Sequence, residues 1–292
     1  MMKFIKLPAR GKPNMAKLKG KKDTKGKLLK RRLPWFVWLA IGLGIVAVVA
    51  FVRTSPTCGP TGPSHPGEPK AAIVDQLYSL QPNEDFIQQT TQELEDYGFE
   101  VDLYQGDKIT VDLYRHLPGL GYKVIIFRAH SGLLGMEGEI IKRTCLFTNE
   151  PYSERKHVAE QLSDQLAMAR IDEHHPWVFA IGDEFVTQSM KGQFANTVVI
   201  MMGCSCLYLD DLAQAFIEKG ASTYLGWDVA VDLSYVDDAS ISLVQNLCGE
   251  NLTVREAVAK TMAEKGPDPR HGAELKYYPA KSGSRTVTEL LR

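Results

Sequence analysis

Two short apolar runs, each followed by a chemically reactive side chain, constrain the fold of this chain more than any other feature. The run at 198–202 reads VVIMM and leads directly into Gly203 and Cys204. The run at 123–127 reads KVIIF and leads to His130. Such short β-branched runs are typical of buried parallel strands, and ligands of open α/β sheets collect at the carboxyl ends of the strands. The sequence therefore predicts Cys204 and His130 at the same edge of one sheet.

Strand and helix patterns alternate through residues 70–266. This alternation predicts an α/β fold with a mostly parallel sheet and helices on both faces. A hairpin is expected within 133–148, and Thr253 with Glu256 forms the capping box of the last helix. The other expected strands are 71–78, 100–105, 177–181 and 222–227, and the expected helices are 83–97, 111–117, 154–170, 183–190, 210–219, 235–248 and 254–265.

A thiol and an imidazole at two strand ends can act as a nucleophile and its base. The thiolate is the reactive form of cysteine, so Cys204 needs a proton acceptor, and His130 is the candidate. Gly203 would let a substrate backbone approach closely. Gly132 can adopt a positive φ and aim its N–H, together with that of Cys204, at an oxyanion. This combination predicts acyl transfer by attack, thioester formation and hydrolysis.

Other roles for the cysteines stay open at this point. A cysteine at the end of a buried strand most often only fills space in the core. Cys204 and Cys206 could also form a redox pair or half of a soft metal site, but no further ligands stand at suitable spacing, so no metal is expected. The sequence does not fix disulfide pairing among Cys58, Cys145, Cys206 and Cys248.

The N-terminal part of the chain reads as a membrane anchor. Residues 1–32 contain thirteen Lys or Arg and one acid, whereas the whole chain has a formal net charge of −1. Residues 33–52 are twenty uncharged residues, enough to cross a bilayer, with Trp35 and Trp38 near one end. A cleaved signal peptide is the rival, but Arg53 follows the run in place of a small-residue cleavage site.

The positive-inside rule places residues 1–32 in the cytoplasm and the rest of the chain outside the cell membrane. A basic segment next to a span binds the anionic inner leaflet, so no nucleic-acid partner is expected. No phosphate-binding loop is present and no cofactor is expected. The predicted organisation is a basic tail (1–32), a single-pass helix (33–52), a Pro/Gly-rich linker (53–69), an α/β domain (70–266) and a polar C-terminal tail (267–292).

Two segments resemble a known group of enzymes. IIFRAHSG (125–132) followed by VVIMMGC (198–204) is similar to the caspase–gingipain superfamily of cysteine peptidases. The stretches 212–232 and 252–262 are similar to its CHAT and gingipain-like branch, and the resemblance covers about 71–265. It implies a caspase-like three-layer α/β sandwich in which His130 is the base and Cys204 the nucleophile. It also implies that the N–H groups of Gly132 and Cys204 are oxyanion donors.

Specificity in that superfamily comes from a pocket for one charged or polar side chain. Trp227 and Asp228 stand at the next strand end and are candidates to line it, and an acidic pocket would prefer Arg or Lys. The alternative is that Trp227 lies in the core and Asp228 caps a turn. The sequence thus predicts a membrane-anchored cysteine endopeptidase with a preference for basic residues, or otherwise a catalytically inactive binding or scaffold domain on the same anchor.

Two further motifs carry weaker predictions. His174 and His175 are adjacent, so their rings diverge, and a solvated loop is expected there. Asn251 lies in an Asn-Leu-Thr sequence that matches a glycosylation acceptor, although Thr253 also serves as the cap of the following helix.

Overall fold

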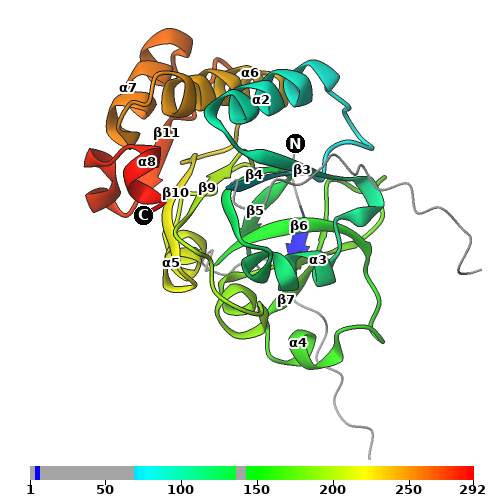
Figure 1. Cartoon of the computed structure of the whole chain (residues 1–292). Helices are drawn as coiled ribbons and strands as arrows, with labels where there is room; N and C mark the ends of the chain where they lie inside the picture. The colour runs from blue at the N-terminus through cyan, green and yellow to red at the C-terminus, as the bar shows by residue number, and fades with distance from the viewer. Residues whose placement is uncertain (1–3, 7–68, 136–142) are drawn as a thin grey trace, which may run out of the picture. The chain divides into compact units, whose positions relative to one another are not determined.

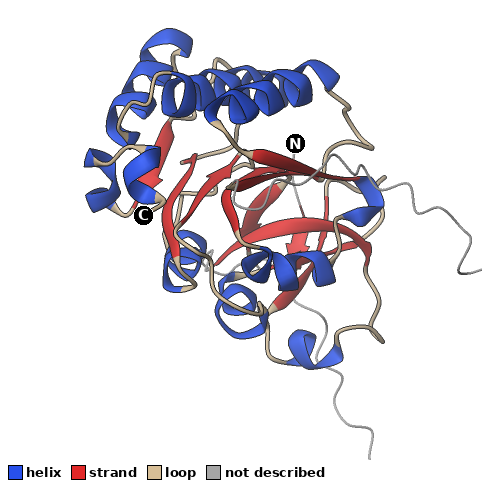
Figure 2. Cartoon of the chain, viewed as in Figure 1, coloured by secondary structure: helices blue, strands red, loops and turns tan. Residues whose placement is uncertain are grey.

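The main sheet has six strands in the order β11-β10-β9-β4-β2-β3 (Figures 1 and 2). The structure, a computed structural model, describes residues 4–6, 69–135 and 143–292. Five strands run parallel to their neighbours and β11 is antiparallel at the edge, so the predicted α/β fold with a mostly parallel sheet is confirmed. The strands are β2 (Lys70–Asp75), β3 (Glu100–Gln105), β4 (Tyr122–Arg128), β9 (Thr197–Met201), β10 (Ala221–Trp227) and β11 (Leu275–Tyr278).

The central strands are apolar on both faces because both faces of the sheet are covered. Ile73 and Ile126 belong to one buried cluster, whereas their chain neighbours Val74 and Phe127 belong to the other. Successive side chains of a strand point to opposite faces. A strand with core on both sides therefore reads as a continuous apolar run, which is the pattern seen at 123–127 and 198–202.

One face is covered by a layer of helices, α2, α6 and α7, that lie together in Figure 1. The Asn83 side chain caps α2 by accepting the Phe86 N–H at 3.0 Å, and Gly98 ends the helix in the left-handed conformation. The predicted capping box of Thr253 and Glu256 is confirmed at the start of α7. The helices are α2 (Glu84–Tyr97), α6 (Leu233–Val244), α7 (Val254–Lys265) and the short α8 (Val287–Leu290).

The other face carries α3 (Val111–His116), α5 (Asp211–Glu218) and a second sheet. That sheet is antiparallel, in the order β1-β7-β8-β6-β5. Its strands β5 (Ser131–Leu134) and β6 (Arg143–Pro151) confirm the hairpin expected after His130. The remaining strands are β1 (Phe4–Lys6), β7 (Leu166–Arg170) and β8 (Val178–Ile181).

The helix expected over 154–170 is wrong for most of its length. Helix α4 (Val158–Leu162) covers only five residues, and β7 (Leu166–Arg170) follows. Asp164 has a positive φ of 57°, which ends helical geometry between the two elements. The sequence of β7 is compatible with a helix, and its pairing with β8 decides for a strand.

The predicted C-terminal tail, 267–292, is also wrong. Strand β11 pairs with β10 at the edge of the main sheet, and α8 follows. Leu275, Val287 and Leu290 are buried in the cluster under the helical layer. These elements span only four residues each, too few for a periodic pattern to stand out from the Gly and Pro around them.

The predicted membrane span at 33–52 lies outside the described residues, as do residues 53–68 of the predicted linker, including Cys58. Among the residues that the structure describes, no helix has the length and apolar character needed to cross a bilayer. The short elements that complete the fold are the 3-10 helices η1 (Gly106–Lys108), η2 (Leu117–Leu120) and η5 (Ala280–Ser284), and the π-helical turns η3 (Phe185–Ser189) and η4 (Gln245–Gly249).

Candidate active site

Strands β4 and β9 are parallel neighbours, and their register brings His130 and Cys204 to the same edge of the sheet. Phe127 lies opposite Met201, and His130 and Cys204 each follow three residues later. The Met202 N–H donates to the Phe127 carbonyl oxygen at 2.9 Å, which continues the strand pairing into the loops. The predicted location of both residues at one sheet edge therefore follows directly from the observed register.

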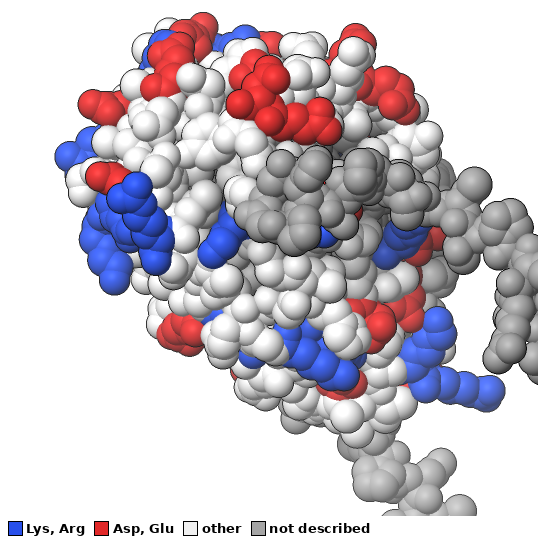
Figure 3. Space-filling model, viewed as in Figure 1, with Lys and Arg blue, Asp and Glu red and all other residues white. Residues whose placement is uncertain are grey.

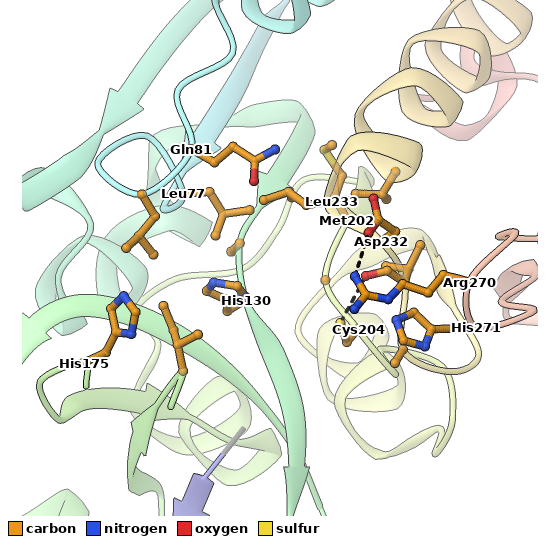
Figure 4. Close-up of a pocket in the computed structure, with 17 residues that line it drawn as sticks. Leu77, Gln81, His130, His175, Met202, Cys204, Asp232, Leu233, Arg270 and His271 are labelled. Carbon is orange, nitrogen blue, oxygen red and sulfur yellow. Dashed lines mark hydrogen bonds and ion pairs between the residues drawn. The ribbon is translucent and has the colours of Figure 1, made fainter. Parts of the chain in front are cut away.

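Both side chains line one pocket of about 380 Å³. Figure 4 shows them on facing walls of it. The His130 wall also carries Leu77, Gln81 and His175, and the Cys204 wall carries Met202, Asp232, Leu233, Arg270 and His271. A nucleophile and a base that flank one cavity can act on a group bound between them.

The loops after β4 and β9 cross in close contact beside this pocket. A Cβ atom on Gly203 would lie 2.2 Å from Ser131 Oγ and 2.6 Å from the Ala129 carbonyl oxygen. The Ser131 hydroxyl donates to the Cys204 carbonyl oxygen at 2.6 Å. The segment that carries the imidazole is thereby bonded to the backbone of the cysteine, so the positions of the two residues are coupled.

A second set of hydrogen bonds holds the backbone of His130. Its N–H donates to Gln76 Oε1 at 2.9 Å, and its carbonyl oxygen accepts the Phe147 N–H at 2.9 Å. The Gln76 amide donates in turn to Asn149 Oδ1 at 2.6 Å. The His130 ring lies against the Phe147 ring, with centroids 5.9 Å apart. The backbone of His130 is therefore held on one side by the turn after β2 and on the other by β6.

A buried ion-pair network lies at the end of β4, two residues before His130. Arg128 is fully buried and donates to Asp75 at 2.9 Å, to Asp237 at 2.8 Å and to the Gln81 carbonyl oxygen at 2.9 Å. Burial raises the pKa of Asp75, and the attraction of Arg128 only partly opposes this. The network joins β2, β4 and α6 to the 77–81 segment that lines the pocket.

Cys204 is half-buried, and its thiol donates to the Val231 carbonyl oxygen at 3.6 Å. This contact directs the sulfur toward Val231 in the loop before α6. The next residue, Ser205, has a positive φ of 55°, and its N–H donates to the Val229 carbonyl oxygen at 2.9 Å. This tight turn directs the cysteine side chain toward the pocket.

The other described cysteines lie in environments that suppress reactivity. Burial raises the pKa of Cys145 and of Cys248 to about 12. Cys206 is fully buried on the opposite side of the loop, and its thiol donates to the Gly203 carbonyl oxygen at 3.1 Å. Because Cys204 and Cys206 project to different sides of the loop, the arrangement does not favour a redox pair between them.

The two predicted oxyanion glycines lie in different places. Gly203 lines the pocket, but the reason for glycine there is the crossing of two loops, not the approach of a substrate. Gly132 lies within β5, opposite Cys145 of β6, and is not among the residues of the pocket wall. The positive φ expected at Gly132 does not fit this extended strand.

The predicted specificity residues lie away from the pocket. Trp227 is buried in the core, with its ring 5.5 Å from that of Tyr235. Asp228 accepts the Glu274 N–H at 2.9 Å and lies 3.8 Å from the ammonium of Lys276. These positions correspond to the structural alternative considered for both residues, a core tryptophan and an aspartate that holds a turn.

Five polar pocket residues were missed from sequence, namely Gln81, His175, Asp232, Arg270 and His271. Arg270 and His271 lie in the segment that was expected to be a tail, and Asp268 holds it by accepting both their N–H groups, at 2.6 and 2.9 Å. His175 belongs to the expected solvated loop, and its Nδ1 lies 2.7 Å from Asp172 Oδ1. For Arg270 and His271, the available sequence signal was Asp268 itself. An Asp side chain often accepts backbone N–H groups two or three residues later, as in an Asx turn.

Within residues 4–6, 69–135 and 143–292, no group of three or more His, Cys, Asp or Glu side chains is arranged to hold a metal ion. No protein-family model matches the chain, and no curated protein matches it at a significant level.

Proposed function

We propose that this protein is a membrane-anchored cysteine endopeptidase with a caspase-like α/β domain. One observation carries the proposal: His130 and the half-buried thiol of Cys204 follow neighbouring parallel strands and line one pocket. The sheet with helices on both faces is consistent with the sandwich that the sequence resemblance implies.

In the first half of the proposed reaction, His130 takes the proton of the Cys204 thiol as the sulfur attacks the carbonyl carbon of a peptide bond. The tetrahedral intermediate collapses when His130 gives that proton to the leaving amine, and the C–N bond breaks. The acyl group stays on Cys204 as a thioester.

In the second half, His130 takes a proton from water, which attacks the thioester carbonyl. The C–S bond breaks, the carboxylic product leaves, and the proton returns to the Cys204 sulfur. Before the first half of the reaction can begin, the thiol must exchange its hydrogen bond with Val231 for one with the imidazole. Substrate binding between the two walls is the step that would bring this about.

A second candidate function, a catalytically inactive binding or scaffold domain, has one observation in its favour. The 3.6 Å contact of the Cys204 thiol with the Val231 carbonyl oxygen holds the sulfur on its own wall of the pocket. A domain of this kind would bind a peptide in the pocket without cleaving it.

We also propose that residues 33–52 anchor the protein in the cell membrane, with residues 1–32 on the cytoplasmic, anionic leaflet and the α/β domain outside. Acidic side chains gather over the helical layer in Figure 3. Helix α2 alone contains five acidic residues and no Lys or Arg. An acidic domain surface is repelled by anionic lipid and by nucleic acid. This repulsion supports the proposal that the basic tail, and not the α/β domain, contacts the anionic leaflet.

The test of activity uses the full-length chain in detergent with a panel of fluorogenic peptides. Wild type should cleave at least one peptide, and Cys204→Ala should abolish the cleavage. Replacement of His130 by Ala should lower the rate by at least about 100-fold, since a general base contributes 10²–10⁴-fold.

The matched controls are Cys248→Ala, which removes a buried thiol, and His174→Ala, which removes an imidazole with 84% of its side chain exposed. Both should keep wild-type rates. Equal cleavage by wild type and Cys204→Ala would end the catalytic proposal. Peptide binding without cleavage by any variant would favour the binding domain.

A further inference from the structure

The surface that a substrate meets beside Cys204 is mostly apolar. Met202 contributes to the pocket from the loop after β9, Val231 from the loop after β10, and Leu233 and Val236 from the start of α6. Leu77 and Leu80 contribute from the facing segment. Leu80 is 45% exposed although it is a large apolar residue. A concave apolar surface next to a reactive group is the usual form of a site for an apolar side chain.

The charged groups of the pocket are already engaged by the protein itself. The Asp232 carboxylate caps α6 by accepting the Ser234 N–H at 3.1 Å, and it lies 3.4 Å from the Arg270 guanidinium. Figure 4 shows Arg270 beside Asp232 at the Cys204 wall. Arg270 and Asp232 offset one another's charge, so the pair leaves no net charge at this wall to select a basic or an acidic substrate side chain.

The position of His130 decides which part of the substrate meets this surface. The leaving amine must face His130 to receive its proton, so the residue that forms the acyl-enzyme lies toward the Cys204 wall. Figure 4 places Met202 and Leu233 on that wall. The acyl-side residue is therefore the one in contact with the apolar surface.

We propose that the substrate is a peptide with a bulky apolar residue, such as Leu or Phe, on the amino side of the cleaved bond. This inference rests on the proposed function and replaces the preference for Arg or Lys expected from the sequence. Each methylene recognised in an apolar pocket changes kcat/KM by about 10–200-fold. A leucine peptide should thus exceed the matching alanine peptide by at least about 10-fold.

The experiment uses the full-length chain and peptides that differ only at the residue before the cleaved bond, namely Leu, Phe, Ala, Arg and Asp. Leu and Phe should give the highest kcat/KM, followed by Ala, with Arg and Asp lowest. The variant Leu233→Arg should lower cleavage of the Leu peptide by at least about 10-fold and raise cleavage of the Asp peptide. The control Leu162→Arg changes a 66% exposed leucine of α4 outside the pocket and should match wild type.

A binding measurement separates this inference from the proposed function. Fluorescence anisotropy of labelled peptides ending in Leu or Arg is measured on Cys204→Ala, with and without Leu233→Arg. Cleavage after Arg that Leu233→Arg leaves unchanged would overturn the apolar preference but keep the peptidase. Selective binding of the Leu peptide, lost with Leu233→Arg, in a protein that cleaves nothing would keep the apolar pocket and overturn the peptidase. Equal binding of both peptides would overturn the inference.

Discussion

Single residues at the crossing of the β4 and β9 loops have little room for change. Ser131 Oγ fills the space that a Cβ on Gly203 would need, and the same hydroxyl donates to the Cys204 carbonyl oxygen. The thiol of Cys204 and the ring of His130 are therefore held relative to one another by atoms that do not take part in the proposed chemistry. This coupling explains how two residues 74 positions apart in the sequence can line one pocket.

We expect Gly203→Ala to lower the free energy of unfolding by about 3 kcal/mol, the upper part of the range for an overpacked core. One of the three atoms in the way is a backbone carbonyl oxygen, which cannot rotate aside. The control is Gly119→Ala, whose new Cβ would meet its nearest neighbour at an ordinary 3.6 Å. Urea unfolding of both variants and wild type checks this, and equal midpoints for Gly203→Ala and Gly119→Ala would contradict it.

At the scale of elements, Arg128 links the ends of β2 and β4 to α6 through buried ion pairs. It connects Asp75 at the end of β2 with Asp237 inside α6, and it also holds the Gln81 carbonyl oxygen. Asn83 adds a bond to Asp237 at 2.8 Å and caps α2 at the same time. The pocket wall at 77–81 and the helical layer thus share one buried polar network.

Replacing Arg128 by Met should lower the free energy of unfolding by about 3–5 kcal/mol, because the variant leaves buried carboxylates without their counter-charge. The control Lys265→Met removes a surface ion pair with Asp238, 2.8 Å long, and should cost less than about 1 kcal/mol. Urea unfolding at neutral pH measures both effects. A similar loss for the two variants would show that the Arg128 network contributes no more than a surface pair.

The loop that brings Arg270 and His271 to the pocket depends on one carboxylate. Although burial alone would raise it, the pKa of Asp268 lies below its ordinary value of 3.8 because the N–H groups of Asp232, His271 and Arg270 donate to the carboxylate. A folded-state pKa below the unfolded value means that the carboxylate stabilises the protein above about pH 3.8. This contribution is lost as the pH falls through the folded-state pKa.

Asp268→Asn should therefore be less stable than wild type at pH 7, and the difference should shrink as the pH is lowered below 3.8, the ordinary value for Asp. The control is Asp96→Asn on the exposed face of α2, which should change little at either pH. Urea unfolding at pH 7 and pH 3 provides the measurement. A wild-type advantage that stays constant between the two pH values would mean that the charge of Asp268 is not responsible.

At the scale of the whole molecule, the chain returns to the main sheet after the last long helix. Strand β11 closes the β10 edge, and α8 buries Val287 and Leu290 against the same core as α7. The segment also supplies Arg270 and His271 to the pocket. The C-terminal residues are therefore required both for the core and for the candidate site.

Removal of residues 267–292 from the full-length chain should abolish cooperative unfolding, because it exposes the β10 edge and part of the apolar cluster under the helices. Circular dichroism melts of the full-length and truncated chains test this. A truncated chain with the same melting temperature as the full-length chain would show that β11 and α8 are dispensable.

The sequence by itself determined the parallel strands, the long helices with their caps, and the shared sheet edge of His130 and Cys204. These features depend on local periodicity and on a strand alternation that admits few topologies. Only the tertiary structure decided the strand at 166–170, the folded C-terminus, and the placement of Trp227 in the core. It also decided the apolar pocket wall, since that wall joins segments as distant as Leu80 and Leu233. Short elements and pocket walls are fixed by partners far along the chain, and no local pattern contains them.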